Sequence, residues 1–251
     1  MKKYLLLVIP LIFGISSASA EVSIQNDQHY IGSDGSLHIV GEIFNQLEVP
    51  LNQIDVRVTL YTENEIVDTV RTNSLVNTIM PGMKGPFDLI ITGQKAQIID
   101  DYSLDVDYKV SNPKSQAIDV TSSDISRDKF DNLVITGTVA NNGEITANAI
   151  SIVATLYDRD GNVAAVSKSL ATPDYLRSND EVFFLVPVTD KQQTISIVDY
   201  TLVAESEEYA AAPEFPLGTL LLLGGSVSFY VILTRYSTRT VPNLISATNS
   251  S

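Results

Sequence analysis

Residues 36–46, SLHIVGEIFNQ, recur as NLVITGTVANN at residues 132–142. Residues 54–64, IDVRVTLYTEN, recur in the same way as ISIVATLYDRD at residues 150–160. Both pairs are separated by the same offset of 96 residues. A constant offset over such a length is the signature of an internal repeat, so the sequence predicts two copies of one domain.

The same offset matches other residues of the two copies. It relates Gly41 to Gly137, Asn45 to Asn141 and Phe87 to Phe183, and it becomes 98 where Asp101 matches Asp199. We therefore expect a first domain at residues 21–112 and a second at 113–206. The Asn112-Pro113 dipeptide, which is typical of a turn, marks the junction between them.

Each copy shows the period-two alternation of apolar and polar residues that is typical of β-strands. The apolar rows are Leu37, Ile39, Gly41 and Ile43, then Ile54, Val56, Val58 and Leu60, and in the second copy Leu133, Ile135, Gly137 and Val139, then Ile150, Ile152, Ala154 and Leu156. Later strands are predicted at residues 87–92, 102–110, 182–188 and 200–204. Short strands separated by turn residues predict an all-β fold of two tandem immunoglobulin-like β-sandwiches. Tyr102 and Tyr200 open a late strand in each copy, where a tyrosine corner is one role open to them.

The repeats also resemble the FxLYD domain of exported archaeal and bacterial proteins. The resemblance rests on VTLYT at residues 58–62, ATLYD at residues 154–158, the G-x-x-x-N element before each, and Pro81-Gly82 ahead of Phe87. Val58 and Ala154 replace the Phe of that motif, and Thr62 replaces its Asp in the first copy. The resemblance implies a β-sandwich surface module without assigned chemistry.

The two ends of the chain carry apolar runs. Residues 1–20 combine Lys2 and Lys3, a short apolar stretch and a small-x-small site ending at Ala20, the pattern of a secretory signal peptide. Residues 215–233 form a run of 19 residues without a charge, long enough for a transmembrane helix.

The charges that flank the second run predict its orientation. Arg235 and Arg239 follow it, which places residues 234–251 in the cytoplasm and the domains outside. Residues 207–214 are then expected to be a short stalk. The predicted location is the cell membrane, with a single-pass anchor and an extracellular (pseudoperiplasmic) N-terminal ectodomain.

Pro213-Glu214-Phe215-Pro216, an apolar stretch and Arg235 resemble the archaeal PEF-type C-terminal sorting signal. The resemblance implies recognition by a membrane-embedded, sortase-like enzyme that cleaves the tail and transfers the protein to a lipid. The 16 residues after Arg235 depart from that pattern, so an uncleaved anchor is the alternative.

Charge excludes some partners. All 30 acidic residues lie between Glu21 and Glu214 together with 12 of the 16 basic residues, a net charge of −18 for this segment. Such a segment repels nucleic acid, so no nucleic-acid partner is expected. The chain has no Cys, which excludes disulfides and thiolate chemistry.

The sequence offers few catalytic or metal-binding candidates. The two histidines, His29 and His38, have no nucleophile motif in their context and are expected to be surface residues. DRDGN at residues 158–162 places Asp158, Asp160 and Asn162 at the spacing that opens a calcium loop, but the bidentate Glu is missing, so a hairpin turn with Gly161 at positive φ is favoured over Ca²⁺.

Several acidic pairs and one loop complete the candidates. The pairs are Asp100 with Asp101, Asp105 with Asp107, and Glu207 with Glu208. Asp105 and Asp107 share one strand face and are expected to be solvated. MPGMKGP, residues 80–86, is expected to be a connecting loop, although a binding tip is the alternative. No catalytic, cofactor-binding or metal-binding residue is assigned.

These observations predict a non-enzymatic, membrane-anchored cell-surface protein with a structural or adhesive role in an archaeal cell envelope and with envelope or surface-layer proteins as partners. One alternative is an extracytoplasmic ligand-binding or accessory subunit of a membrane protein complex. Another is a hydrolase that uses the acidic pairs.

Overall fold

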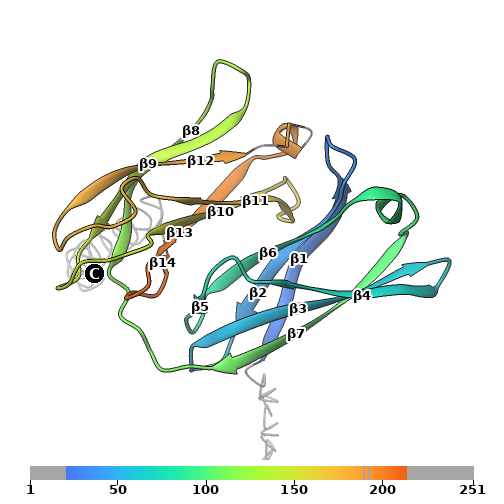
Figure 1. The fold of residues 1–251 in the computed structure, drawn as a ribbon, viewed down its shortest axis with the longest axis horizontal. Helices are drawn as coiled ribbons and strands as arrows, with labels where there is room; N and C mark the ends of the chain where they lie inside the picture. Colours follow the sequence, from blue (N-terminus) through green and yellow to red (C-terminus); the bar gives the residue numbers. More distant parts are fainter. Residues whose placement is uncertain (1–20, 189, 192, 214–251) are drawn as a thin grey trace, which may run out of the picture.

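The computed structural model of the chain describes residues 21–188, 190–191 and 193–213. These residues form two all-β units that lie side by side (Figure 1). In each unit two sheets face one another across a hydrophobic core, as expected of a β-sandwich.

The predicted signal peptide (1–20), transmembrane segment (215–233) and tail (234–251) lie outside the described residues. Within the described part of the chain, no helix has the length and hydropathy needed to cross a membrane.

The first unit contains seven strands and one short 3₁₀ helix. They are β1 (Val22–Ile31), β2 (Leu37–Asn45), β3 (Leu51–Thr62), β4 (Glu65–Asn73), β5 (Thr78–Ile79), β6 (Lys84–Ile91), η1 (Gly93–Gln97) and β7 (Asp101–Val110). One sheet has the order β1-β2-β6, and the other places β3 between β4 and β7, with β5 pairing the start of β3.

The second unit repeats this arrangement. Its elements are β8 (Ile118–Arg127), β9 (Leu133–Asn141), β10 (Ser151–Tyr157), β11 (Val163–Leu170), β12 (Glu181–Val188), η2 (Gln193–Ile195), β13 (Asp199–Glu205) and β14 (Ala212–Pro213). The sheets have the orders β12-β9-β8 and β11-β10-β13-β14. The strands predicted from the sequence are all present, whereas β1, β4, β5, β8, β11 and β14 were not predicted.

A glycine and a phenylalanine fix the register of each core. Gly41 pairs with Phe87 and Gly137 with Phe184, and a Cβ atom on either glycine would lie within 2.9 Å of ring atoms of that phenylalanine. Each glycine therefore leaves the space that the ring fills. The partner of Phe87 in the second copy is thus Phe184, which is buried, and not Phe183, which is 57% exposed.

A longer hairpin explains that correction. Leu60 pairs with Asp68 across the β3–β4 hairpin, but Leu156 pairs with Ala165 across the β10–β11 hairpin, so the second hairpin holds one more residue. The offset therefore rises from 96 to 97 before β12. Because side chains alternate between faces, a one-residue error assigns the wrong phenylalanine to the core.

The Asn of each G-x-x-x-N element has a structural role. The Asn45 side chain donates to the carbonyls of Val49 and Ile79, each at 2.9 Å, and its oxygen accepts from the Leu47 N–H at 3.0 Å. Asn141 makes the equivalent three bonds in the second unit. Both residues are fully buried, so these bonds satisfy backbone groups that would otherwise lack partners.

The two late tyrosines do not form a tyrosine corner with the backbone. The Tyr102 hydroxyl donates to Asp27 Oδ2 at 2.8 Å, and the Tyr200 hydroxyl lies 3.1 Å from Ser123 Oγ. Each hydroxyl therefore reaches a side chain on the first strand of its own unit, in the opposite sheet.

The segment expected to be a stalk lies against the second unit. Tyr209, Ala210, Ala211 and Ala212 are all buried, and Ala212 pairs with Ala204 of β13. The small residues allow this segment to fit beside the core. The predicted Asn112-Pro113 junction lies in the connection between β7 and β8.

Candidate functional site

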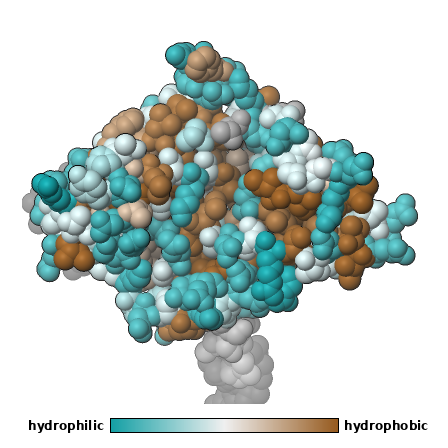
Figure 2. Space-filling view, in the orientation of Figure 1, coloured by the Kyte–Doolittle hydropathy of each residue, from teal (hydrophilic) through white to brown (hydrophobic). Residues whose placement is uncertain are grey.

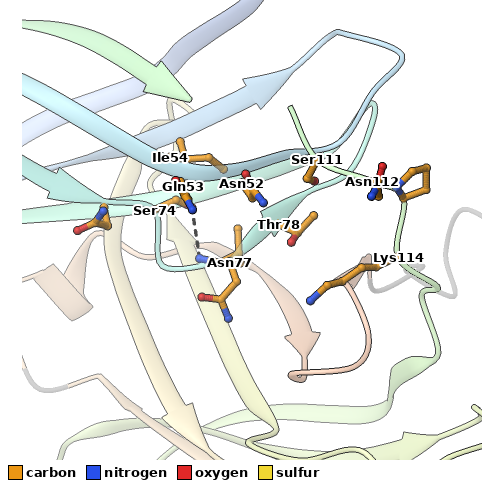
Figure 3. A pocket seen from close by; sticks show the side chains of 12 residues that line it. Asn52, Gln53, Ile54, Ser74, Asn77, Thr78, Ser111, Asn112 and Lys114 are labelled. Carbon is orange, nitrogen blue, oxygen red and sulfur yellow. Dashed lines mark hydrogen bonds between the residues drawn. The ribbon is translucent and has the colours of Figure 1, made fainter. Parts of the chain in front are cut away.

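A pocket of about 630 Å³ opens at the end of the first unit where β3 begins (Figure 3). We call it the amide pocket. It is lined by Asn52, Gln53, Ile54, Asn73, Ser74, Val76, Asn77, Thr78, Ser111, Asn112, Pro113 and Lys114. These residues come from the start of β3, from the connection between β4 and β5, and from the segment that follows β7.

The local backbone shapes this pocket. The ladder between β3 and β7 is interrupted between Asn52 and Asp55, and Gln53 has a positive φ of 47°. A bulge of this kind bends the strand and redirects its side chains. The second copy has the same feature, since Ala149 has a φ of 50°.

The chemistry of the lining is unusual for so acidic a chain. Amide side chains (Asn52, Gln53, Asn73, Asn77 and Asn112) and hydroxyl side chains (Ser74, Thr78 and Ser111) dominate it. Among the described residues, the lining contains one cation, Lys114, and no Asp or Glu. The amides and hydroxyls can each donate and accept hydrogen bonds. The lining therefore suits a ligand that is rich in hydroxyl groups and neutral or negatively charged.

One polar atom of the lining lacks a partner. Ser111 Oγ is buried and makes no hydrogen bond to any residue that the structure describes. Buried hydroxyls are usually satisfied, so a partner supplied from the pocket would complete this group.

A second group of polar residues lies between the units. His38 Nδ1 is 3.1 Å from both carboxylate oxygens of Asp88, and His38 Nε2 is 3.1 Å from Ser36 Oγ. The Tyr30 ring stacks on the His38 ring at 4.8 Å. His38 also lines a hollow of about 340 Å³ together with Lys168 of the second unit.

This Ser-His-Asp arrangement is not that of a working triad. Ser36 is 2% exposed and its hydroxyl donates to Asp34 Oδ1 at 2.5 Å, so Ser36 Oγ accepts from His38 Nε2. Nδ1 faces a carboxylate and also donates. Because the Ser36 hydroxyl hydrogen points to Asp34 and not to His38, the imidazole is not placed to take that proton as the general base that a serine nucleophile requires.

The environment of His38 agrees with its charged form. The hydrogen bond to Asp88 raises the pKa of His38, and the charges of Asp88, Asp190 and Asp34 add to this effect, whereas partial burial opposes it. The His38 side chain is only 14% exposed, so the expectation that it is a surface residue was wrong. The ion pair with Asp88 was not visible in the sequence because 50 residues separate the two.

Two buried carboxylates join the units. Glu42 of β2 accepts from the Tyr157 hydroxyl of β10 at 2.5 Å and from Lys84 Nζ at 2.7 Å. Glu205 of β13 accepts from the backbone N–H of Asn77 at 2.9 and 3.1 Å. Each unit therefore contributes one buried acid that accepts a hydrogen bond from the other unit.

Lysine and apolar contacts complete this interface. Lys168 Nζ lies 3.4 Å from Glu205 and donates to the Leu75 carbonyl at 2.6 Å. Burial raises the pKa of the Glu205 carboxyl, while the Asn77 N–H and Lys168 oppose that rise. Val153 of the second unit is buried within the core of the first.

The loop considered for calcium forms a turn. Asp158 Oδ1 accepts from the backbone N–H groups of Asp160 and Asn162, each at 2.9 Å, and Gly161 has a φ of 83°. The carboxylate is thus occupied by its own loop. Within the described residues, no three His, Asp or Glu side chains gather in a way that could hold a metal ion.

The acidic pairs do not form a site. Asp105 and Asp107 are both bound by Arg57 on an exposed strand face, as the sequence predicted. Asp100 accepts from the Glu63 N–H, and Glu208 binds Asn148.

Of the predicted loop at residues 80–86, residues 80–83 form a tight connection between β5 and β6, and residues 84–86 begin β6. The Gly82 N–H donates to the Asn45 carbonyl at 2.8 Å, and the Met83 N–H to the Met80 carbonyl at 3.0 Å. No structural feature of this loop sets it apart as a binding tip.

Sequence reasoning missed the amide pocket and the buried acids. The pocket had a signal, since the stretches 51–54, 73–78 and 111–114 combine amides and hydroxyls without an acid. Nothing local indicated that they converge, because they meet only after β3, β4 and β7 have formed one sheet.

Comparison with known proteins adds one family match. Residues 115–211, which form the second repeat, match the family described as "Protein of unknown function (DUF3426)". No curated protein matches the chain.

Solved structures resemble the chain only distantly. The exo-chitosanase CsxA of Amycolatopsis orientalis has 8% identity over 76% of this chain and 26% of its own, with a TM-score of 0.28. Red sea bream transglutaminase has 9% identity over 78% of this chain and 31% of its own, with a TM-score of 0.23. A calcium-binding mutant of Bacteroides uniformis beta-glucuronidase 2 has 13% identity over 76% of this chain and 27% of its own, with a TM-score of 0.27. The chain thus spans less than a third of each of these proteins, and no functional argument rests on them.

Proposed function

We propose that this chain is a non-enzymatic cell-surface protein, anchored by a single membrane span, with a structural or adhesive role in an archaeal cell envelope. Its two units are immunoglobulin-like sandwiches of the FxLYD type and face the outside. The signal peptide and the PEF-type tail, read from the sequence, support the location.

The observation that carries the structural role is the interface between the units. Glu42 and Glu205 are 2% and 1% exposed, and each takes a hydrogen bond from the other unit. Breaking a buried pair of this kind by removing one partner is strongly destabilising. A two-domain ectodomain held in this way favours a fixed spacer or adhesive module over two independently moving domains.

The membrane anchor is tested by comparing the full chain with a chain that ends at Pro213. We expect the full chain in the membrane fraction, resistant to extraction by salt and alkali and released by detergent. The shortened chain is expected to be secreted in soluble form. Protease added to intact cells should digest the ectodomain of the full chain. Recovery of the full chain in the cytosol would overturn the proposal.

One feature favours the accessory-subunit alternative. On β12, Phe183 and Leu185 are 57% and 45% exposed and lie on the outward face of an edge strand. On the side of the molecule seen in Figure 2, apolar residues lie among hydrophilic ones over both units. Co-purification of a membrane partner in mild detergent, lost on Phe183→Ser with Leu185→Ser, would favour this alternative. Recovery of the free protein would favour the structural role.

A further inference from the structure

The second copy shows what the asparagine of the amide pocket can bind. Asn148 is the repeat partner of Asn52, because the two residues are separated by the same 96 residues that separate β3 from β10. The Asn148 backbone N–H donates to Glu208 Oε2 at 2.8 Å, and its side-chain amide donates to Glu208 Oε1 at 2.7 Å. In this copy the backbone and the side chain of the asparagine therefore bind the same carboxylate.

The first copy keeps the asparagine but lacks the acid. With the offset of 98 that relates β7 to β13, the partner of Glu208 is Val110, which is 60% exposed. β7 continues through Val110, paired with Leu51. The side-chain amide of Asn52 has no hydrogen-bond partner among the described residues, and Lys114 adds a cation to the same lining.

Lys114 can donate further hydrogen bonds. Its ammonium donates to the Glu207 carbonyl at 3.0 Å, which uses one of its three hydrogen atoms. The Glu205 carboxylate, which binds the Asn77 N–H beside the pocket, lies near enough to Lys114 for their charges to attract, but no Asp or Glu is among the described residues that line the pocket itself. A carboxylate brought by a ligand would meet a cation and free amide donors, which form strong charge-assisted hydrogen bonds.

The rest of the lining suits hydroxyl groups. Gln53, Asn77 and Asn112 present amides that make no side-chain hydrogen bond to the described residues, and Ser111 Oγ is buried without a partner. The volume of about 630 Å³ is in the range of pockets that hold small organic ligands. Figure 3 shows Asn52, Ser111 and Lys114 around the same opening.

We propose that the amide pocket binds an acidic saccharide, with the carboxylate of a uronic acid at Asn52 and Lys114 and its hydroxyl groups at the remaining amides and Ser111. The ligand carboxylate takes the part that Glu208 plays in the second copy. This binding is independent of the anchoring proposed above and goes beyond it, because it assigns a ligand class to the ectodomain.

The test uses the full chain in detergent micelles and titration calorimetry with trigalacturonate, maltotriose and triglutamate. We expect trigalacturonate to bind at least tenfold more tightly than either of the others. Absence of trigalacturonate binding would overturn the proposal. Equal binding of maltotriose would overturn the role of the carboxylate, and equal binding of triglutamate would overturn the saccharide class.

Four variants locate the site. Val110→Glu restores the internal acid of the second copy and is expected to abolish trigalacturonate binding. Lys114→Met, at an exposed position, is expected to weaken it at least tenfold. Asn52→Leu is expected to weaken it at least tenfold as well, whereas Asn148→Leu, the matched change in the second copy, should leave it within twofold. Melting curves of all four variants report folding. Binding unchanged in a folded Lys114→Met and a folded Val110→Glu would overturn the assignment to this pocket.

Discussion

The same sheet face has opposite surroundings in the two units. In the first unit the outer face of β3 and β7 carries Arg57, Asp105 and Asp107, which form ion pairs in solvent. In the second unit the repeat partners of these residues are Val153, Val203 and Glu205, which lie against the first unit. The backbone pairing is the same in the two units: Asp55 faces Asp107 in the first, and their repeat partners Ser151 and Glu205 face one another in the second.

The difference shows how a duplicated domain acquires an interface without changing its fold. The inward row of each strand maintains the sandwich, and the outward row is free to change. Replacing an Arg and an Asp by two valines turns a solvated face into an apolar one. Glu205 and Lys168 provide polar contacts within this apolar face.

The largest effect is expected from removing a core phenylalanine. Phe184→Ala should lower the free energy of unfolding by about 3–5 kcal/mol, since the ring fills the space above Gly137. Phe183→Ala should cost less than about 1 kcal/mol because that side chain is exposed. Denaturant unfolding of both variants measures the difference. Equal losses would mean that the offset of 97 is wrong.

A smaller loss is expected from the interface acid. Glu205→Ala leaves the Asn77 N–H without its acceptor and removes the ion pair of Lys168, at a cost of about 2–3 kcal/mol. The matched change in the first unit, Asp107→Ala, should cost about 0–1 kcal/mol because the ion pair there is exposed. If thermal unfolding showed the same loss for both, the interface would contribute nothing beyond a surface ion pair.

A pH dependence is expected from His38 in the first unit. Its pKa is raised in the folded protein, so the folded state holds the proton more tightly than the unfolded chain. The stabilisation is complete below the unfolded pKa of about 6.5 and is lost as the pH rises through the higher folded pKa.

The groups around His38 include three acids, Asp88, Asp34 and Asp190, which raise its pKa. Tyr30 stacks on its ring, and Lys168 lines the same hollow. His38→Gln should remove the fall in melting temperature above about pH 6.5, whereas His29→Gln should keep it. A fall that persists in His38→Gln would assign the titration to another group.

The smallest effect is expected on the solvated face. Arg57→Ala removes the ion pairs to Asp105 and Asp107 and should cost about 0–1 kcal/mol, less at high salt. Val153→Ala at the matched position should cost more, because its side chain is buried in the core of the first unit. Melting at low and high salt separates the two, and a salt-independent loss in Arg57→Ala would contradict the solvated arrangement.

Much of the fold could be predicted from local patterns. Alternation located the inward rows of β2, β3, β9 and β10, and the repeat related the two copies. The edge strands β1 and β8 were missed because their polar residues hide the alternation. The offset of 96 assigned Phe183 to the core wrongly, because the β10–β11 hairpin holds one additional residue. That insertion cannot be recognised from the sequence, since the two hairpin loops differ in sequence.

The candidate sites were much less predictable. Asp158 and the pair Asp105 and Asp107 were visible as motifs, but their carboxylates bind their own turn or Arg57. Ser36, His38 and Asp88 meet across two strands, and the amide pocket draws on three separate stretches. Such groupings depend on contacts between distant residues, which a local pattern does not encode.

The sequence by itself determined that this chain holds two copies of an alternating, cysteine-free β domain with a strongly acidic surface. It could do so because side-chain periodicity and charge are properties of neighbouring residues. Only the tertiary structure decided which outer face is covered, that Glu42 and Glu205 are buried, and that unpaired amides converge beside Lys114. Those outcomes depend on how two similar units pack, and the free energy of that packing belongs to residues far apart in the chain.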